Sequence, residues 1–517
     1  MTEVRPRPSR AVFVWSLALA ASLVITVAVQ ASAGPSSAYG KFGFIGKNLG
    51  KTPAYGEPTL AIAPDGKHVV ASTPGSNSKG QGTVQIWYSK DDGKSWHSTY
   101  YTSPSGGGDS EIDFLPNGTL LSADLELTDS YIQMSKDYGK TWKPIGEAGM
   151  EQDRQWLAHS PDGKTAYLVY HDFVLEAEWI AVSNDGGNTW STSPLDQIPV
   201  TSVDQVAPPA LVGNGGHASI IDQGVNTFSG PLLVNKNGRD LYVVYSISDV
   251  QSNVNPLIAV PPFGPVRQLV LSHSGDGGQS WESHVAVQAD QSPNGADEDE
   301  VGTLFPWGFI DQGGTVYMVY NSTQGAPEGH FHQYYVYTKD HGATWSRPVK
   351  LDGLPMDQGA AVYATGDAVR AGVIDVAWYE STDGVPSDDS AHWKPVMAQV
   401  TGANTPHPKV TRSAVTSTYN HHGGICLQGI LCGIAPGSSD RSLLDFFQLV
   451  VNPKTHMAEI AFADNYRLAD NHDFGTVVVA KQTKTPGSST KSSLPGLVAV
   501  LPMAIAAGWQ GRRRRKR

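Results

Sequence analysis

Carboxylate side chains stand before or at the start of several apolar segments that alternate as strands do. They are Glu57, Asp109, Glu111 and Asp153. Two carboxyl groups that face each other across a channel can hydrolyse a glycosidic bond, one as acid and the other as base or nucleophile. Trp156 and Trp307 are close to similar segments, where aromatic rings could stack on sugar faces. We therefore take these six residues as candidate catalytic and ligand-binding groups.

Two arginines and a tyrosine–glutamate pair extend the set of candidates. Arg154 and Arg441 stand just before predicted strands, and Tyr379 and Glu380 end another strand. Neighbouring residues of a strand point to opposite faces, so Tyr379 and Glu380 could act together only if the chain bends there. Asp153, next to Arg154, could equally form a structural ion pair.

An octapeptide recurs five times along the chain. Each copy reads hydroxyl-x-Asp-x-Gly-x-hydroxyl-Trp. The Asp and Trp of the five copies are Asp91 and Trp96, Asp137 and Trp142, Asp185 and Trp190, Asp276 and Trp281, and Asp340 and Trp345. In a hairpin turn the Asp can accept bonds from amides further on, Gly supplies a positive φ, and the Trp covers the turn.

The octapeptide resembles the Asp-box, or BNR repeat, of the sialidase-like β-propeller family. The first three Asp positions are 46 and 48 residues apart, about one four-stranded blade each. Strand pairs joined by turns such as Pro64-Asp65-Gly66 precede the boxes. The resemblance implies that the boxes lie at the outer edge of the propeller, that their Asp residues are structural, and that any chemistry occurs where the innermost strands begin.

The predicted fold is all-β, a single β-propeller with seven blades. Two units without a box keep the strand pattern, one near residues 360–400 and one near 446–480. A segment near Lys41–Ile45 could supply the fourth strand of the last unit and close the ring. Six blades is the alternative, because the boundaries after Leu351 depend on strand pattern alone.

The resemblance also implies a test for sialidase chemistry. In that family three arginines clamp the substrate carboxylate, and a Tyr activated by Glu is the nucleophile. Here Glu57 stands where the first of these arginines is expected, and no arginine occurs between Arg10 and Arg154. This departure puts the arginine clamp, and with it the usual sialidase mechanism, in doubt.

Both ends of the chain predict export. Residues 1–33 have the arginines, apolar run and small-residue cleavage site of a signal peptide, although a retained anchor is the alternative. The propeller is assigned to residues 34–482 and a flexible spacer to 483–493. Residues 494–517 are apolar and then basic, which predicts a membrane anchor or sorting signal rather than a merely solvated end. We expect a secreted or surface-anchored monomer.

Charge and cysteine usage agree with that location. The net charge is −12, with +2 in residues 1–33 and +6 in residues 512–517, so the remaining body carries −20 and nucleic acid is not an expected partner. Cys426 and Cys432 predict one disulfide; the alternative is a metal site with His421 and His422. The run Asp297–Glu300 predicts a solvated loop, with weak calcium binding as the alternative, and no other metal or cofactor is expected.

These observations leave two hypotheses for the function. The first is a non-catalytic surface propeller that binds an extracellular glycan or protein through an acidic axial face. The second is an exo-glycosidase, a sialidase or a related glycoside hydrolase, that acts on extracellular glycans. Release of sugar from a glycan panel, and convergence of three arginines, would distinguish them.

Overall fold

The structure is a computed structural model, and the described residues all belong to one compact unit, Ala38–Arg517. Described are residues 42–49, 56–76, 81–102, 104, 107–126, 129–150, 152–172, 177–195, 225–250, 263–289, 299–427, 429, 440–466 and 475–483. This part of the chain contains no helix that is long and apolar enough to cross a membrane.

Strands dominate the fold, and they form seven antiparallel sheets that we number as blades. Blades 1 to 3 contain β2 (Thr59–Ile62), β3 (Val69–Ser76), β4 (Gly82–Ser89) and β5 (His97–Tyr101); β6 (Ser110–Phe114), β7 (Leu120–Glu126), β8 (Asp129–Ser135) and β9 (Lys143–Ala148); and β10 (Gln152–His159), β11 (Ala166–Asp172), β12 (Ala177–Ser183) and β13 (Ser191–Pro194). Within each blade the strands pair in sequence order, as meanders do.

The remaining four sheets continue the same order. Blades 4 and 5 contain β14 (Val225–Val234), β15 (Leu241–Val250), β16 (Phe263–Ser274) and β17 (Glu282–Gln288), and β18 (Trp307–Ile310), β19 (Val316–Ser322), β20 (His332–Thr338) and β21 (Val349–Lys350). Blade 6 contains β22 (Ala360–Arg370), β23 (Val373–Ser381), β24 (His392–Thr401) and β25 (Lys409–Ala414), with β26 (His421–His422) paired to β24. Blade 7 contains β27 (Gln448–Val451), β28 (Ala458–Asp464), β29 (Thr476–Gln482) and β1 (Phe44–Asn48).

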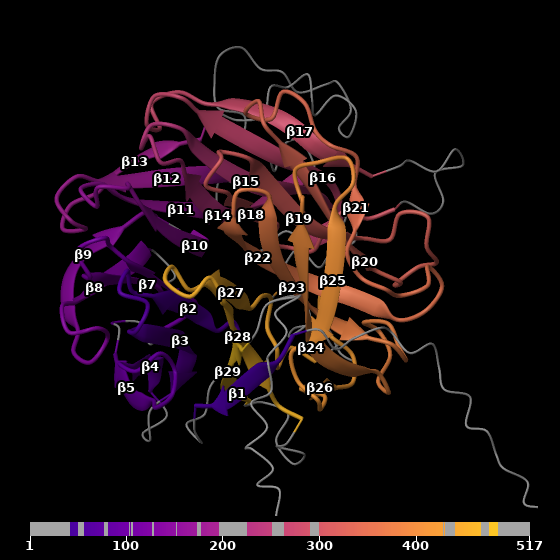
Figure 1. The fold of residues 1–517 in the computed structure, drawn as a ribbon. Helices are drawn as coiled ribbons and strands as arrows, with labels where there is room; N and C mark the ends of the chain where they lie inside the picture. Colours follow the sequence, from indigo (N-terminus) through magenta and orange to yellow (C-terminus); the bar gives the residue numbers. More distant parts are fainter. Residues whose placement is uncertain are drawn as a thin grey trace, which may run out of the picture. The chain divides into compact units, whose positions relative to one another are not determined.

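The first strand of each blade lines a common hub. Each of these innermost strands contacts the innermost strand of the next blade, and β27 of blade 7 contacts β2 of blade 1. Figure 1 shows the sheets arranged around this centre, with the yellow strands of blade 7 returning beside the indigo strands of blade 1. The prediction of a seven-bladed propeller is confirmed, and the six-bladed alternative is wrong.

Blade 7 is completed by the N-terminal strand, as the sequence predicts. β1 is its outermost strand and pairs antiparallel with β29. The Leu49 N–H donates to the Val477 carbonyl at 2.9 Å, and the Thr483 N–H donates to the Gly43 carbonyl at 2.7 Å. These bonds join the two ends of the propeller and hold the ring closed.

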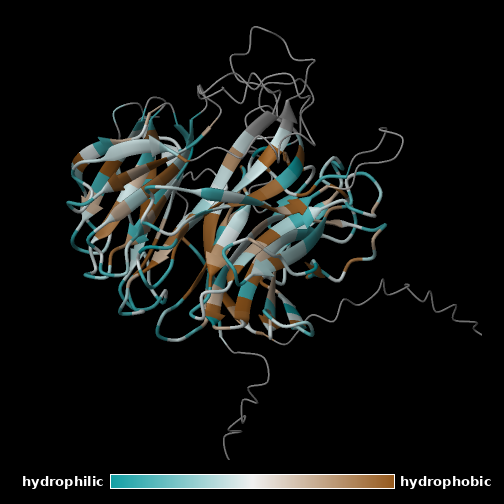
Figure 2. Cartoon of the chain, turned by 90° about the horizontal axis from the view of Figure 1, so that it is seen from above, coloured by the Kyte–Doolittle hydropathy of each residue, from teal (hydrophilic) through white to brown (hydrophobic). Residues whose placement is uncertain are grey.

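The core lies between neighbouring sheets, because both faces of most strands are covered by adjacent blades. The second strands are buried along their whole length in blades 3, 5, 6 and 7, where β11, β19, β23 and β28 have no exposed residue. Figure 2 shows hydrophobic residues along many strands of the sheets and mainly hydrophilic residues in the connecting loops. The successive clusters of buried side chains couple each blade to the next.

The five octapeptides form turns with the same hydrogen bonds around their Asp, and in the first three the Trp indole N–H also donates to the Gly carbonyl. In the second copy the Ser135 hydroxyl donates to Asp137 and accepts from the Gly139 N–H, while Thr141 donates to Asp137 through both its N–H and its hydroxyl. The Trp142 indole N–H donates to the Gly139 carbonyl at 3.0 Å. Such bonds, led by that from the Thr189 hydroxyl, lower the pKa of Asp185 in the third copy to about 2.

The same turns also contact the preceding blade. The glycine two residues after each box Asp has a positive φ, and in three of the five boxes a Cβ added there would lie within 3.5 Å of an apolar side chain of the preceding blade. At Gly139 the distance to Val70 of blade 1 would be 3.2 Å, and at Gly342 the distance to Leu271 of blade 4 would be 3.2 Å. The octapeptides therefore join blades as well as strands.

Several sequence predictions fall outside the described residues. They are the signal peptide (1–33), the spacer (483–493, apart from Thr483), the apolar and basic tail (494–517), Asp297, Glu298 and Cys432. Cys426 is buried at the start of its loop, with 1% of its surface exposed. The disulfide and the domain boundaries at the two ends stay predictions.

A pair of proline substitutions in β1 tests ring closure. Because Leu49 and Gly43 form hydrogen-bonded pairs with β29, alternation places the Lys47 N–H in the ladder and the Gly46 N–H outside it. We expect Lys47→Pro to lower the free energy of unfolding by about 1–3 kcal/mol, as a lost ladder bond does. Gly46→Pro is the matched control, and equal losses of thermal stability in the two variants would contradict the role of this pairing.

Candidate functional site

Charged residues gather where the innermost strands begin. We call Glu57, Asp109, Asp153, Arg441 and Asp445 the axial mouth. Glu57 precedes β2, Asp109 precedes β6, Asp153 lies at the start of β10, and Arg441 and Asp445 belong to the loop that enters β27. The ring thus brings together four of its seven strand entries, and each of them carries a candidate residue that the sequence predicted: Glu57, Asp109, Asp153 or Arg441.

Specific contacts hold the mouth together. The Arg441 guanidinium donates to Asp445 Oδ2 at 2.7 Å, and the Asp445 N–H donates to Glu57 Oε1 at 3.0 Å. Glu57 is 2% exposed and Asp445 is 7% exposed, whereas Asp109 and Asp153 are half-buried. Asp109 and Asp153 are therefore the carboxyl groups that a ligand can reach most easily.

Burial favours the protonated form of these carboxyl groups. Burial raises the pKa of Asp153 to about 7, and the negative charge of Asp109 acts in the same direction. Burial, together with Asp109 and Asp445, raises the pKa of Glu57 well above its usual value, and Arg441 only partly opposes this. The mouth therefore holds carboxyl groups that can carry a proton near neutral pH, as a general acid requires.

The backbone of the mouth is held in an unusual conformation. Glu57, Tyr363 and Leu444 have φ values of 56°, 58° and 54°, which non-glycine residues rarely adopt. A Cβ at Gly56 would lie 2.2 Å from the Leu443 carbonyl oxygen, so only glycine allows these two loops to approach so closely. Strained residues of this kind are concentrated at functional sites, where the surrounding structure enforces them.

Arg154 is not part of the mouth. Its guanidinium donates to Glu111 Oε2 at 2.7 Å and lies over the rings of Trp156 and Phe446, 4.1 Å and 4.2 Å from their centroids. Arg154 is fully buried and Glu111 is 4% exposed. We call these four residues the hub plug. Arg154 thus pairs with Glu111, and the alternative ion pair with Asp153 is wrong.

The tryptophans predicted to stack on sugars are part of the hub core. Trp156 is 1% exposed and Trp307 is 4% exposed, and their rings meet edge to face at 5.4 Å. Each indole N–H donates to a carbonyl of a neighbouring blade, Ser229 for Trp156 and Gly366 for Trp307. Both rings are therefore packed within the hub core, and neither has the exposed face on which a sugar could stack.

A cavity of about 420 Å³ extends along the innermost strands of all seven blades. Glu111 and Trp156 of the hub plug line it, together with residues toward the ends of the strands such as His159 and Asp367. The His159 Nδ1 lies 2.6 Å from Asp113 Oδ2, and burial raises the pKa of Asp367 to about 6. None of the mouth residues lines this cavity, so mouth and cavity are separate parts of the hub.

The remaining candidates do not converge as a sialidase site requires. Among the described arginines, only Arg441 is at the mouth, because Arg154 is in the hub plug. Tyr379 packs against Phe447 at 4.4 Å, whereas Glu380 accepts from the Trp378 indole at 3.0 Å. Tyr379 and Trp378 belong to different core clusters, so Tyr379 and Glu380 face opposite sides of β23 without the bend that joint action would need.

The structure adds residues that the sequence analysis did not select. Asp445 is at the mouth because its loop leads into β27. It follows Arg441 by only four residues, which could have indicated this position from the sequence. His171, near the end of β11, lies close enough to Asp153 to influence its pKa, and its Nδ1 is 3.3 Å from Glu178 Oε1. Tyr363 donates its hydroxyl to the Cys426 carbonyl, which places the start of the cysteine loop beside the mouth. No sequence signal marks His171 or Tyr363.

The fold and the site define a seven-bladed β-propeller with an acidic axial mouth. Solved structures with a similar fold include an α-L-arabinanase from Penicillium chrysogenum in complex with arabinobiose, at 17% identity over 74% of this chain and 94% of that chain, with a TM-score of 0.39. Others are an α-L-arabinofuranosidase from Fusarium graminearum, at 14% identity over 72% and 98% with a TM-score of 0.40, and the NanB sialidase from Streptococcus pneumoniae, at 12% over 84% and 69% with a TM-score of 0.38. No model of a protein family and no curated protein matches the sequence.

Removing one partner of the hub plug tests its role in stability. At pH 8, Glu111→Gln leaves the buried Arg154 charge without its counter-ion, so we expect a loss of roughly 3–5 kcal/mol in the free energy of unfolding. Lys164→Ala breaks the exposed pair of Lys164 with Asp162 and should cost no more than about 1 kcal/mol. Denaturant unfolding measures both, and the double variant Glu111→Gln, Arg154→Met should recover part of the loss. If Glu111→Gln and Lys164→Ala lower the free energy of unfolding equally, the hub plug does not depend on the Glu111–Arg154 pair.

The raised pKa values predict that stability falls as the pH rises. Burial raises the pKa of Glu111, Asp153, Asp375 and Glu380 to about 7 in the folded protein. The folded state then keeps protons that the unfolded state releases above about pH 4, so the free energy of unfolding decreases from pH 5 to pH 8, by at most about 1.4 kcal/mol per pH unit for each group.

Asp375→Asn should flatten this dependence, because the Gln399 amide can still donate to Oδ1 while the group no longer titrates. Asp162→Asn is the control, since hydrogen bonds, led by that from Ser160, lower the pKa of Asp162 to about 2, outside the range measured. Melting temperatures between pH 5 and pH 8 provide the measurement. Stability that increases with pH over this range would show that the buried carboxyl groups are ionised in the folded protein.

Proposed function

We propose that the protein is an extracytoplasmic glycoside hydrolase of the sialidase-like superfamily that acts on neutral sugars at the axial mouth. The observation that carries this proposal is the gathering of four carboxyl groups around a single guanidinium at the strand entries of the hub. Paired carboxyl groups are the usual machinery of glycosidic bond hydrolysis. The five box turns support placement in this superfamily, because each repeats the same pattern of bonds around its Asp.

Charge favours a neutral substrate. The mouth contains Glu57, Asp109, Asp153 and Asp445 against Arg441 alone, and the body of the chain carries a net −20 outside its two ends. An anionic sugar such as a sialic acid would be repelled by this surface and would meet one guanidinium in place of a clamp of several. A neutral sugar has no such penalty and can hydrogen-bond to the carboxyl groups.

Burial assigns different tasks to the carboxyl groups. Asp153 is accessible and has a pKa near 7, so it can hold the proton that the leaving group takes up. Asp109 is also accessible and lies close enough to Asp153 to influence its pKa, so it would serve as base or nucleophile. Glu57 and Asp445 are more deeply buried and bonded to each other's loops, so they position the mouth.

A non-catalytic binding function is the second candidate. Arg441 donates to the Asp445 carboxylate and the Asp445 N–H donates to Glu57, and such contacts also suit a rigid binding surface. In this case the mouth would bind a glycan or a protein without cleaving it. The export signal and the C-terminal tail that the sequence predicts would place either activity at the cell surface.

Hydrolysis of a panel of aryl glycosides tests the proposal. The panel contains neutral sugars, including an α-L-arabinofuranoside, and a sialoside. We expect release of aryl alcohol from a neutral glycoside, and loss of about 10²–10⁴-fold in kcat with Asp153→Asn. Asp162→Asn is the matched control, because Asp162 lies in the exposed turn between β10 and β11.

The controls separate the alternatives. Unchanged melting temperatures show that the loss of activity is not a loss of fold. Activity that survives in Asp153→Asn would overturn the assignment of the acid. Hydrolysis of the sialoside but of no neutral glycoside would overturn the proposal that the substrate is a neutral sugar. If no glycoside is cleaved but a glycan array shows binding that Asp153→Asn abolishes, the binding function replaces the hydrolase.

A further inference from the structure

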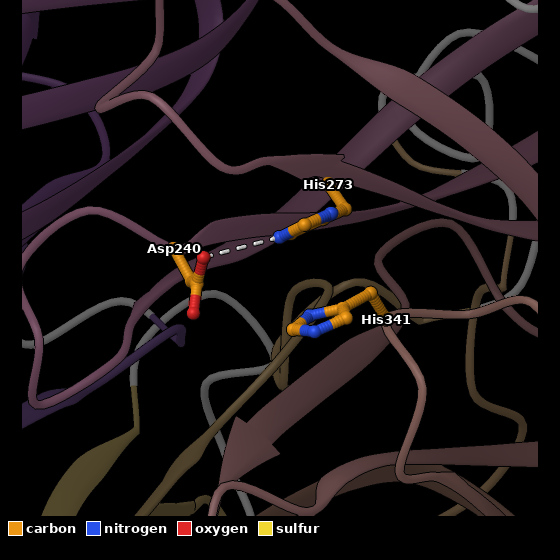
Figure 3. Close-up of side chains that lie close together, drawn as sticks. All are labelled: Asp240, His273 and His341. Carbon is orange, nitrogen blue, oxygen red and sulfur yellow. Dashed lines mark ion pairs between the residues drawn. The ribbon is translucent and has the colours of Figure 1, made fainter.

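Three side chains with metal-ligating atoms meet far from the mouth. Asp240, His273 and His341 each offer one ligand atom, and these atoms all lie within 4.8 Å of one another. His273 Nε2 is 3.5 Å from Asp240 Oδ1 and has no hydrogen-bond partner, although it is buried. Figure 3 shows both imidazole rings directed toward the carboxylate.

Two blades supply these residues. Asp240 ends the turn between β14 and β15, and His273 lies near the end of β16, all in blade 4. His341 belongs to the box turn between β20 and β21 in blade 5, at a φ of 61°. The other boxes have Asp92, Tyr138, Gly186 and Gly277 at this position. The histidine is thus a feature of this one joint between blades.

Neighbouring residues orient the ligand atoms. The side-chain amides of Asn235 and Asn237 donate to Asp240 Oδ2 at 3.2 Å and 2.6 Å, which leaves Oδ1 directed toward His273. The Tyr242 hydroxyl is 2.8 Å from His341 Nδ1. A histidine that binds a metal through one nitrogen usually donates the other N–H to a neighbouring acceptor, so Nε2 of His341 is the free ligand atom.

The distances suit a tetrahedral ion. Zinc is bound at about 2.0–2.1 Å by imidazole and carboxylate, so two ligands of one tetrahedral ion are roughly 3.4 Å apart. The distance of 3.5 Å between His273 and Asp240 matches this value. His341 is exposed but stacks on His273 with ring centroids 4.3 Å apart, so its ring must turn out of this stack to share an ion with His273.

The donor set agrees with the geometry. Two imidazoles and one carboxylate form a donor set that is common for Zn²⁺.

We propose that Asp240, His273 and His341 bind a divalent transition metal ion, with Zn²⁺ as the preferred ion. The ion would join blade 4 to blade 5, with one coordination position left for water. This site is independent of the axial mouth, and it departs from the sequence-based expectation that the chain has no such metal site.

Titration of the full chain with Zn²⁺, prepared without a polyhistidine tag, tests the proposal. Isothermal titration calorimetry should give one ion per chain, and Zn²⁺ should raise the melting temperature while Ca²⁺ should not. His341→Gly should abolish both effects, and it should fold because two other boxes have glycine at this position. Tyr242→Phe should weaken binding by about 10–100-fold, the usual cost of losing a supporting residue.

His422→Ala is the matched control. His422 stacks on His392 at 4.6 Å beside Asp383, so this cluster has the same composition, but its ligand atoms do not converge on a common point. Binding in His422→Ala should equal that of the unaltered chain. Absence of stoichiometric Zn²⁺ binding, or equal binding by His341→Gly, would overturn the proposal. Loss of Zn²⁺ binding in His422→Ala would also overturn the proposal, because it would show that the ion binds in blade 6.

Discussion

The pairing of β1 with β29 is the interaction on which the rest of the structure depends. It completes the outer edge of blade 7 with a strand from the opposite end of the propeller. Once it forms, the innermost strand of blade 7 is held against that of blade 1. The hub is then a closed channel, and the loops entering the strands must share a small space. The close approach of Gly56 to the Leu443 carbonyl is one consequence.

This crowding determines the chemistry of the hub. Burial raises the pKa of Glu57 and Asp153 at the entries of the strands, so these carboxyl groups are easier to protonate than in solution. The carboxyl groups of the hub are balanced by arginine in two different arrangements. In the hub plug it pairs Glu111 with Arg154 between two aromatic rings, while at the mouth four carboxyl groups share one arginine. The first arrangement is suited to packing, and the second leaves proton-carrying groups accessible to a ligand.

The box turns show how a local motif takes on a second role. The hydrogen bonds around their Asp close within eight residues, and in three of the five boxes the glycine also packs against the preceding blade. The variable position after the Asp points into the same joint. His68 of blade 1 stacks on Tyr138 of the second box at 3.6 Å, and His341 of the fifth box stacks on His273 of blade 4 at 4.3 Å. The contact between a box turn and the preceding blade contains stacked rings at the second box, and at the fifth box it brings metal-ligating side chains together.

Features that depend on neighbours along the chain could be predicted from the amino-acid sequence. They include the five boxes, the spacing of the blades and the entry positions of Glu57, Asp109 and Asp153, because turns and alternating strands are local patterns. The contact partners of these residues depend on how the blades pack. Arg154 bonds to Glu111, 43 residues away, and Asp445 bonds to Glu57, 388 residues away. Trp156 and Trp307 proved to be core residues for the same reason. Closure of the ring sets these distances, and no pattern within one blade contains that information.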